Sequence, residues 1–138
     1  MSESSRLVIV NNIDELKTIE GRLNELAESW DIPSKTVFNI MLSLEELVSN
    51  TIFYGFNDND EHTIVLSFHL NGDALKICIE DNGVAFNPLD AGTPNIDDTV
   101  ENRPIGGLGI HLVKNLMDSV EYQRNNDMNI LTIVKTLR

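Results

Sequence analysis

Apolar residues recur at helical spacing in three parts of the chain. Between residues 13 and 30 they lie at positions 16, 19, 23 and 26, which predicts a helix with one apolar face. A second helix is predicted from Ser34, a candidate N-cap, to about Phe53, with Gly55 ending it. The segment "IHLVKNLMDS" predicts a third helix directly after a group of glycines.

Alternating apolar and polar residues predict the strands. "RLVIV" predicts a first strand, and the two runs around Asn71-Gly72 predict a tight hairpin because both residues tolerate positive φ. "VEYQRN" and "NILTIVKTL" predict a second hairpin around "NDM". Residues 87–105 hold most of the prolines and little periodicity, so they predict a long loop, typical of a functional lid or of disorder. This order of elements predicts one α+β domain over residues 1–138, a two-layer sandwich with helices on one face of a sheet.

The charge of the chain indicates which kinds of molecule it can bind. The chain of 138 residues has 22 acidic and 10 basic residues, and its net charge of −12 argues against direct nucleic-acid binding. A protein or small-molecule partner fits this charge, and so does mere solubility. The apolar runs are far shorter than the roughly 20 residues that span a bilayer, and "MSESSR" lacks the features of a signal peptide. We therefore predict a cytoplasmic protein that does not bind membranes.

The stretch "EELVSN" places Glu46 and Asn50 one turn apart on the second helix. At 100° per residue both lie opposite the apolar stripe of that helix, and their spacing lets them address one ligand. Such a face is often only solvated, but here the aromatic Phe53 shares it. A carboxylate with an amide oxygen suits Mg²⁺, and a carboxylate alone suits a general base.

The stretch "EDNGVAF" places Asp81 at the end of a predicted strand. A carboxylate there can accept a hydrogen bond from an exocyclic amine, and Gly83 permits close backbone approach. An ordinary turn from strand to loop has the same pattern. The motif alone therefore leaves both interpretations open.

The stretch "RPIGGLGIHL" contains three glycines, Gly106, Gly107 and Gly109, at the start of the predicted third helix. The free amides and the dipole of a helix N-terminus favour phosphate, although a structural helix start is an equal alternative. The segment lacks the Lys-Ser/Thr ending of a P-loop, and it follows a loop rather than a strand, unlike a dinucleotide fingerprint.

Taken in this order, "EELVSN", "DNG" and "GGLG" resemble the N box and the two glycine boxes of the Bergerat-fold (GHKL) ATPases. The loop over about residues 87–105 would be their ATP lid. "LSLEELVSNTIFYGF" and "RPIGGLGIHLVKNLMDSVEY" look most like the bacterial anti-sigma factor serine/threonine-protein kinases, and this resemblance covers nearly the whole chain. It implies a histidine-kinase-like ATPase fold with a mixed, mostly antiparallel sheet.

The resemblance also implies roles for single residues. Asn50 matches a Mg²⁺ ligand, Glu46 the acceptor of the substrate hydroxyl proton, and Asp81 the residue that bonds the adenine amine, with Gly83 under the adenine. The segment that matches the phosphate cradle consists of Gly106, Gly107, Leu108 and Gly109.

Two further residues depend on the resemblance. Arg103, just before the cradle, is a candidate contact of the γ-phosphate, with a plain surface charge as the alternative. Asn129 stands near the place where the family usually has a threonine that supports adenine through water. An amide can substitute for that hydroxyl, so Asn129 is included among the ATP-binding residues.

The activity implied is an ATP- and Mg²⁺-dependent protein serine kinase that is also an anti-sigma factor. It would phosphorylate a STAS-type anti-anti-sigma protein and sequester a sigma factor. The alternative is an ATP-binding regulatory module with little or no transfer, and the presence of Glu46 favours the kinase. A homodimer through the first strand and helix is also implied, but the core explains the stripe at 16, 19, 23 and 26 equally well.

Overall fold

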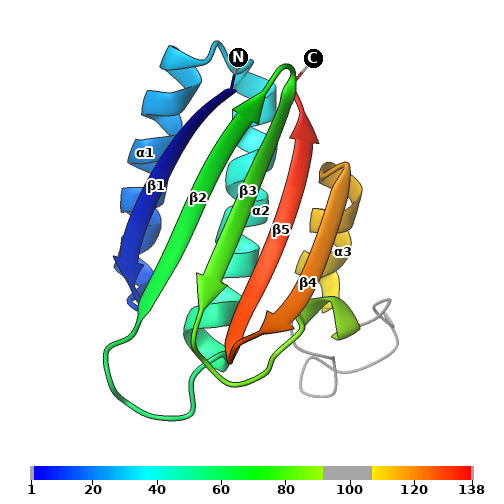
Figure 1. Cartoon of the computed structure of the whole chain (residues 1–138). Helices are drawn as coiled ribbons and strands as arrows, with labels where there is room; N and C mark the ends of the chain where they lie inside the picture. The colour runs from blue at the N-terminus through cyan, green and yellow to red at the C-terminus, as the bar shows by residue number, and fades with distance from the viewer. Residues whose placement is uncertain (1, 92–106, 138) are drawn as a thin grey trace.

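A computed structural model of the chain describes residues 2–91 and 107–137, and Figure 1 shows one sheet with helices against a single face. The strands are β1 (Ser2–Val10), β2 (Thr63–Asn71), β3 (Ala74–Asp81), β4 (Ser119–Asn125) and β5 (Met128–Thr136). The helices are α1 (Leu16–Ser29), α2 (Ser34–Tyr54) and α3 (Gly107–Leu116), with 3-10 turns at Ile13–Glu15 and Pro88–Ala91. The predicted two-layer α+β sandwich is confirmed.

The sheet has the order β1-β2-β3-β5-β4, and every neighbouring pair is antiparallel. Within the described residues there is thus no parallel pair, although the resemblance implied a mixed sheet. Both predicted hairpins form, with φ of 62° at Gly72, and of 52° and 62° at Asn126 and Asp127, residue types that tolerate this region. The second turn pairs Asn129 with Arg124 of β4, and on its other side Asn129 pairs with Asp81 of β3.

Apolar side chains of the two layers meet in one core. Each fully buried Leu, Ile or Val contributes roughly 1.5–3 kcal/mol. The buried residues of the helices are Ile19, Leu23 and Leu26 of α1, Ile40, Leu44, Leu47 and Val48 of α2, and Ile110 and Val113 of α3. The stripe predicted on the first helix therefore packs into this chain's own core. None of the described helices is long and apolar enough to cross a membrane.

The two ends of α2 differ in how well the sequence predicts them. The N-cap is Pro33 and not Ser34, which is the first helical residue and makes no capping hydrogen bond. Proline fits there because its carbonyl still accepts from Val37, at 3.0 Å, and its missing N–H would have been unpaired. Gly55 ends the helix as predicted, but with a right-handed φ of −85° and its N–H donating to Thr51.

Candidate functional site

Glu46 and Asn50 contact each other on the side of α2 that packs against α3. The Asn50 Nδ2 donates to Glu46 Oε1 at 3.1 Å, and because a carboxylate only accepts, the amide Oδ1 must face away from Glu46. Asn50 is only 7% exposed, because α3 covers this side of α2, so the alternative of a merely solvated face does not hold for this residue. Its Oδ1 accepts no hydrogen bond from any residue that the structure describes.

The first turn of α3 lies directly against Glu46. A Cβ built at Gly109 would overlap the Cδ, Oε1 and Oε2 atoms of Glu46, so the carboxylate can keep its present position only beside glycine. Gly107 opens the helix and Leu108 follows, so the free amides and the positive dipole end lie on the same turn. The "EELVSN" and "GGLG" segments thus meet in space.

Some predicted residues lie outside the described part of the chain. Arg103 and Gly106 belong to residues 92–106, as does most of the predicted lid. Of that lid, the structure describes only its first residues, through the 3-10 turn at Pro88–Ala91.

Asp81 is a nearly buried carboxylate at the end of β3, with 3% exposure. Its Oδ1 accepts from the Gly83 N–H at 2.8 Å and from the Asn129 Nδ2 at 3.0 Å. Its Oδ2 receives no hydrogen bond from the described residues. Burial raises the pKa of Asp81, while the hydrogen bonds from Asn129 and Gly83 and the charge of Arg124 act in the opposite direction.

Gly83 makes the close backbone approach that the sequence predicts, but the neighbour is protein. A Cβ at Gly83 would overlap the carbonyl oxygen of Gly55 and would lie 2.9 Å from Asp81 Oδ1. The same carbonyl accepts from the Val84 N–H at 2.8 Å. These contacts join the loop after β3 to the end of α2, so a contact between segments far apart in sequence already requires glycine at this position.

Asn129 lies beside Asp81 and bonds to it directly, as the register of β3 and β5 requires. Its side chain is also held by Tyr122 and Arg124 of β4, which the sequence analysis missed. The predicted hairpin could have indicated both residues. A two-residue turn at 126–127 pairs Arg124 with Asn129 and places Tyr122 on the same face.

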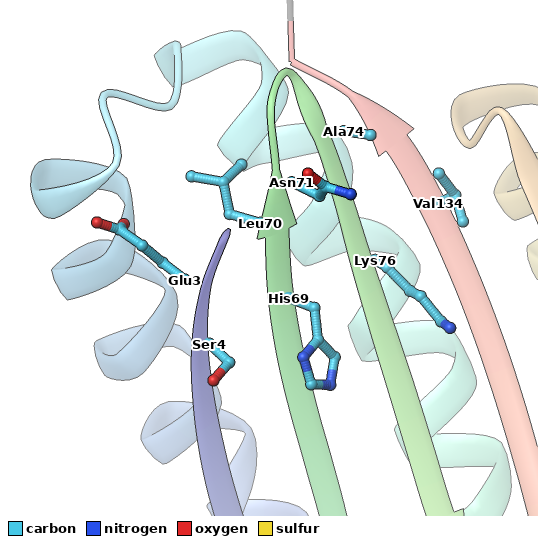
Figure 2. Close-up of a pocket in the computed structure, with 8 residues that line it drawn as sticks. All are labelled: Glu3, Ser4, His69, Leu70, Asn71, Ala74, Lys76 and Val134. Atoms are coloured by element: carbon cyan, nitrogen blue, oxygen red, sulfur yellow. The ribbon is translucent and has the colours of Figure 1, made fainter. Parts of the chain in front are cut away.

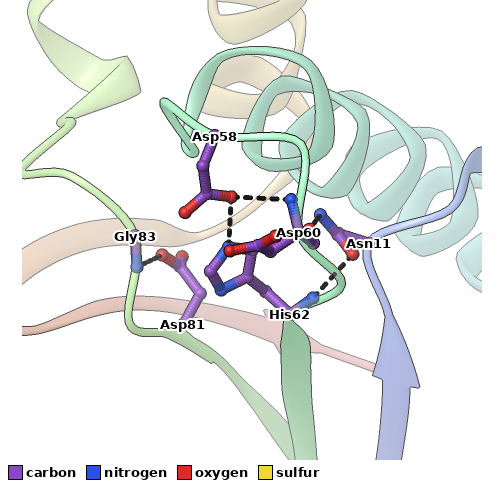
Figure 3. A network of polar contacts seen from close by, with 6 residues as sticks. All are labelled: Asn11, Asp58, Asp60, His62, Asp81 and Gly83. Atoms are coloured by element: carbon purple, nitrogen blue, oxygen red, sulfur yellow. Dashed lines mark hydrogen bonds and ion pairs between the residues drawn. The ribbon is translucent and has the colours of Figure 1, made fainter.

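A small cavity of about 160 Å³ lies beside this loop. It is lined by Phe56, Asn57, Asp58, His62, Asn82, Gly83 and Val84. The ring of His62 stacks on Phe56 with 4.3 Å between centroids. Figure 3 shows His62 beside Asp58, where its Nε2 lies 2.7 Å from Asp58 Oδ1. The hydrogen bond with His62 lowers the pKa of Asp58. The loop between α2 and β2 is therefore held in contact with the Asp81 end of β3.

A larger hollow of about 520 Å³ lies far from these residues. It crosses the outer face of the sheet near the β2–β3 turn, and Figure 2 shows the eight residues that line it, among them Ser4, His69 and Lys76. This turn is at the opposite end of β3 from Asp81. This hollow is thus no part of the candidate site.

The described residues limit how a cation could be held. They include no group of three or more His, Cys, Asp or Glu side chains that could hold a metal ion. Asn50 Oδ1 is a single oxygen ligand, which suits Mg²⁺ because this ion commonly takes only one or two protein ligands and completes its shell with phosphates and water. A metal here would therefore need a phosphate ligand.

Comparison with known proteins gives a consistent result. The family described as histidine kinase-like ATPase domain matches residues 9–135. The serine-protein kinase RsbW of Bacillus mycoides strain KBAB4 is 28% identical over 118 residues, covering 83% of this chain and 71% of the relative. The RsbW protein of Halalkalibacterium halodurans is 29% identical over 126 residues, covering 88% and 73%.

A solved structure agrees with the fold. The RsbU and RsbW domains of Rv1364c from Mycobacterium tuberculosis match with a TM-score of 0.71 at 14% identity. The match covers 98% of this chain but only 32% of that larger chain. At this identity the likeness shows the fold and nothing more.

Proposed function

The chain belongs to the histidine kinase-like ATPase domain family, and from this premise we propose that it is an ATP-dependent protein serine kinase and anti-sigma factor. Its curated relatives are named serine-protein kinases. The observation that carries the proposal is the contact of Glu46 with both Asn50 and Gly109. This contact supports the proposal because it brings together the residues to which we assign the roles of base, metal ligand and phosphate-binding helix start.

The protein's own unpaired acceptors fit ATP and Mg²⁺. Buried polar atoms normally find a partner, yet Asn50 Oδ1 and Asp81 Oδ2 have none among the described residues. Asn50 Oδ1 suits the cation, and Asp81 Oδ2 suits an exocyclic amine. Both atoms belong to residues that are less than 10% exposed, where an unpaired acceptor costs roughly 1–3 kcal/mol until it is satisfied.

Each residue would then have one task in the transfer. Bound ATP supplies the phosphoryl group, and Mg²⁺ neutralises charge on the phosphates. Asp81 Oδ2 accepts from the base amine, and the amides of the first turn of α3 bind phosphate oxygens. Because Glu46 Oε1 is occupied by Asn50, we assign Oε2 as the atom that takes the proton of the substrate serine. Catalysis would consist mostly of positioning and charge neutralisation.

We propose a STAS-type anti-anti-sigma protein as the substrate and a sigma factor as the second partner. Phosphorylation adds about 1.5 to 2 negative charges to the substrate, enough to disrupt a docked interface by repulsion and desolvation. The net charge of −12 on this chain would increase that repulsion. The freed kinase could then hold the sigma factor, and we assign this exchange to the cytoplasm, where sigma factors act.

The test is transfer of phosphate to serine. Purified protein is incubated with Mg-ATP and candidate STAS-type proteins, and phosphoserine is measured by mass spectrometry. Glu46→Gln should lower the transfer rate by at least about 10²-fold while ATP affinity in calorimetry is kept. Glu45→Gln is the matched control, because it changes the same charge on the same turn but lies about 100° further round the helix.

The possible outcomes distinguish the kinase from the regulatory module. Transfer by wild type and Glu45→Gln but not by Glu46→Gln supports the kinase. ATP binding without transfer to any partner favours the regulatory module, and wild-type protein that binds no ATP rules out both.

A further inference from the structure

Asn129 joins Asp81 to strand β4. In the sheet register Asn129 pairs with Asp81 on one side and Arg124 on the other. Its Nδ2 donates to Asp81 Oδ1 at 3.0 Å and to the Val84 carbonyl at 2.7 Å. Its Oδ1 accepts from Arg124 Nη1 at 3.1 Å. A guanidinium on the edge strand is therefore linked to the buried carboxylate through one amide.

The orientation of this amide follows from the chemistry of its partners. A guanidinium can only donate and a carbonyl can only accept, so the Oδ1 must face Arg124 and the Nδ2 must face Val84. Tyr122 Oη at 2.5 Å and the Phe86 N–H at 3.4 Å also donate to the Oδ1. Rotating the amide by 180° would set its NH₂ group against Arg124. Arg124 thus acts together with the Val84 carbonyl and the Phe86 N–H to keep the Nδ2 of Asn129 pointing to Asp81.

Arg124 makes a second contact with the same region. Its Nη1 donates to the Gly83 carbonyl at 2.9 Å, while the Gly83 N–H donates to Asp81 Oδ1 at 2.8 Å. The two donors to Asp81 Oδ1, from Gly83 and Asn129, are therefore both held by one cation. With its Oδ1 occupied twice, Asp81 presents only Oδ2 as an acceptor.

We propose that Arg124 is a positioning residue that holds the Asp81 carboxylate, through Asn129 and Gly83, with Oδ2 as its single free acceptor, and so makes binding selective for a purine that carries an exocyclic amine. The proposal rests on the proposed function only in taking a purine nucleotide as the ligand. Arg124 would act on the ligand only through these two neighbours. Arg124 is an exposed residue of an edge strand outside every motif, and only its hairpin pairing with Asn129 points to it in the sequence.

The first readout uses the protein without nucleotide. In wild type both protons of the Asn129 amide are donated, to Asp81 and Val84, so its exchange with solvent should be slow. In Arg124→Met the amide loses its one charged donor among the described residues, and NMR should show this exchange accelerated by roughly tenfold or more. Lys76→Met is the matched control, because it removes the same charge from an exposed residue on the outer face of the sheet, where it lines the hollow in Figure 2. Unchanged exchange in Arg124→Met would overturn the proposal.

The second readout separates positioning from general loosening. Affinity is measured by calorimetry for ATP and for purine riboside triphosphate, which lacks the exocyclic amine. Wild type and Lys76→Met should prefer ATP, and Arg124→Met should lower that preference by roughly tenfold, the value of one hydrogen bond to a charged group. Arg124→Lys keeps the charge but not the forked geometry, so it should restore only part of the preference.

The alternative results are distinct. If Arg124→Met weakens both nucleotides by the same factor, Arg124 supports the fold only and the positioning role is wrong. If wild type binds neither nucleotide, the proposed function fails, and amide exchange at Asn129 still decides whether Arg124 positions it.

Discussion

Gly109→Ala tests the contact between Glu46 and α3. The new methyl group would overlap all three carboxylate atoms of Glu46, and ordinary carbon contacts begin near 3.5 Å, so the carboxylate must retreat by more than about 1 Å. That shift would break the 3.1 Å hydrogen bond from Asn50. A displacement of this size costs about 10²-fold in rate for a well-positioned catalytic group, which is the loss of transfer that we expect.

Stability should change little in this variant. The overlap involves the far end of a flexible side chain, which can move, and alanine is favoured over glycine inside a helix by roughly 0.5–1 kcal/mol. We therefore expect the free energy of unfolding to stay within about 1 kcal/mol of wild type in urea denaturation. Gly21→Ala in α1 is the matched control, because nothing lies within 4 Å of its added methyl group. That variant should keep full transfer.

A double-mutant cycle with Glu46→Gln decides whether the loss passes through Glu46. If it does, adding Gly109→Ala to Glu46→Gln should cause almost no further loss of transfer, because the base is already gone. The reasoning is refuted if Gly109→Ala transfers phosphate at the wild-type rate. It is equally refuted if the substitution costs the same factor in both backgrounds, since glycine would then be needed for another reason.

Three further predictions concern the same region. Gly83→Ala should lower the free energy of unfolding by about 1–3 kcal/mol in urea, because the methyl group meets the fixed carbonyl of Gly55; a wild-type midpoint would contradict this. Burial raises the pKa of Asp81 above 3.8, so the folded state binds more protons and the free energy of unfolding falls as pH rises from 3.8 to the raised value. Asp81→Asn should remove this part of the decline, and a pH profile identical to wild type would disprove it. Asn50→Ala should weaken ATP affinity roughly tenfold with Mg²⁺ but little with EDTA, measured by calorimetry beside Asn57→Ala, and an equal loss in both conditions would exclude a metal ligand.

The elements of the fold were predictable because burial follows local periodicity. The apolar stripe of α1 and the alternation in β2 and β3 identify their faces without any knowledge of neighbours. The two turns with positive φ then fix the strand register. Only the ends of elements shifted, as at Ser34, where backbone geometry rather than side-chain capping sets the start.

The site was predictable in part. Helical projection could show that Glu46 and Asn50 face the same way, but not that Asn50 is buried, because the covering element, α3, lies more than fifty residues later in the chain. The requirement for glycine at position 83 likewise comes from Gly55, in another element. Arg124 belongs to no motif, and its contacts depend on a strand pairing that composition does not reveal.

The Val84 N–H donates a hydrogen bond to the Gly55 carbonyl and so connects the loop after β3 to the end of α2. It anchors the Asp81 end of the candidate site to the last turn of α2, while Asn50 lies five residues before Gly55, about 7.5 Å along the helix axis. A single rigid helix therefore sets the spacing between the two ends of the site. One residue inserted between Thr51 and Tyr54 would rotate Asn50 by about 100° relative to Asp81, whereas a residue inserted among the exposed positions 57–61 would leave that spacing intact. Length variation in this region should therefore be confined to the loop between α2 and β2.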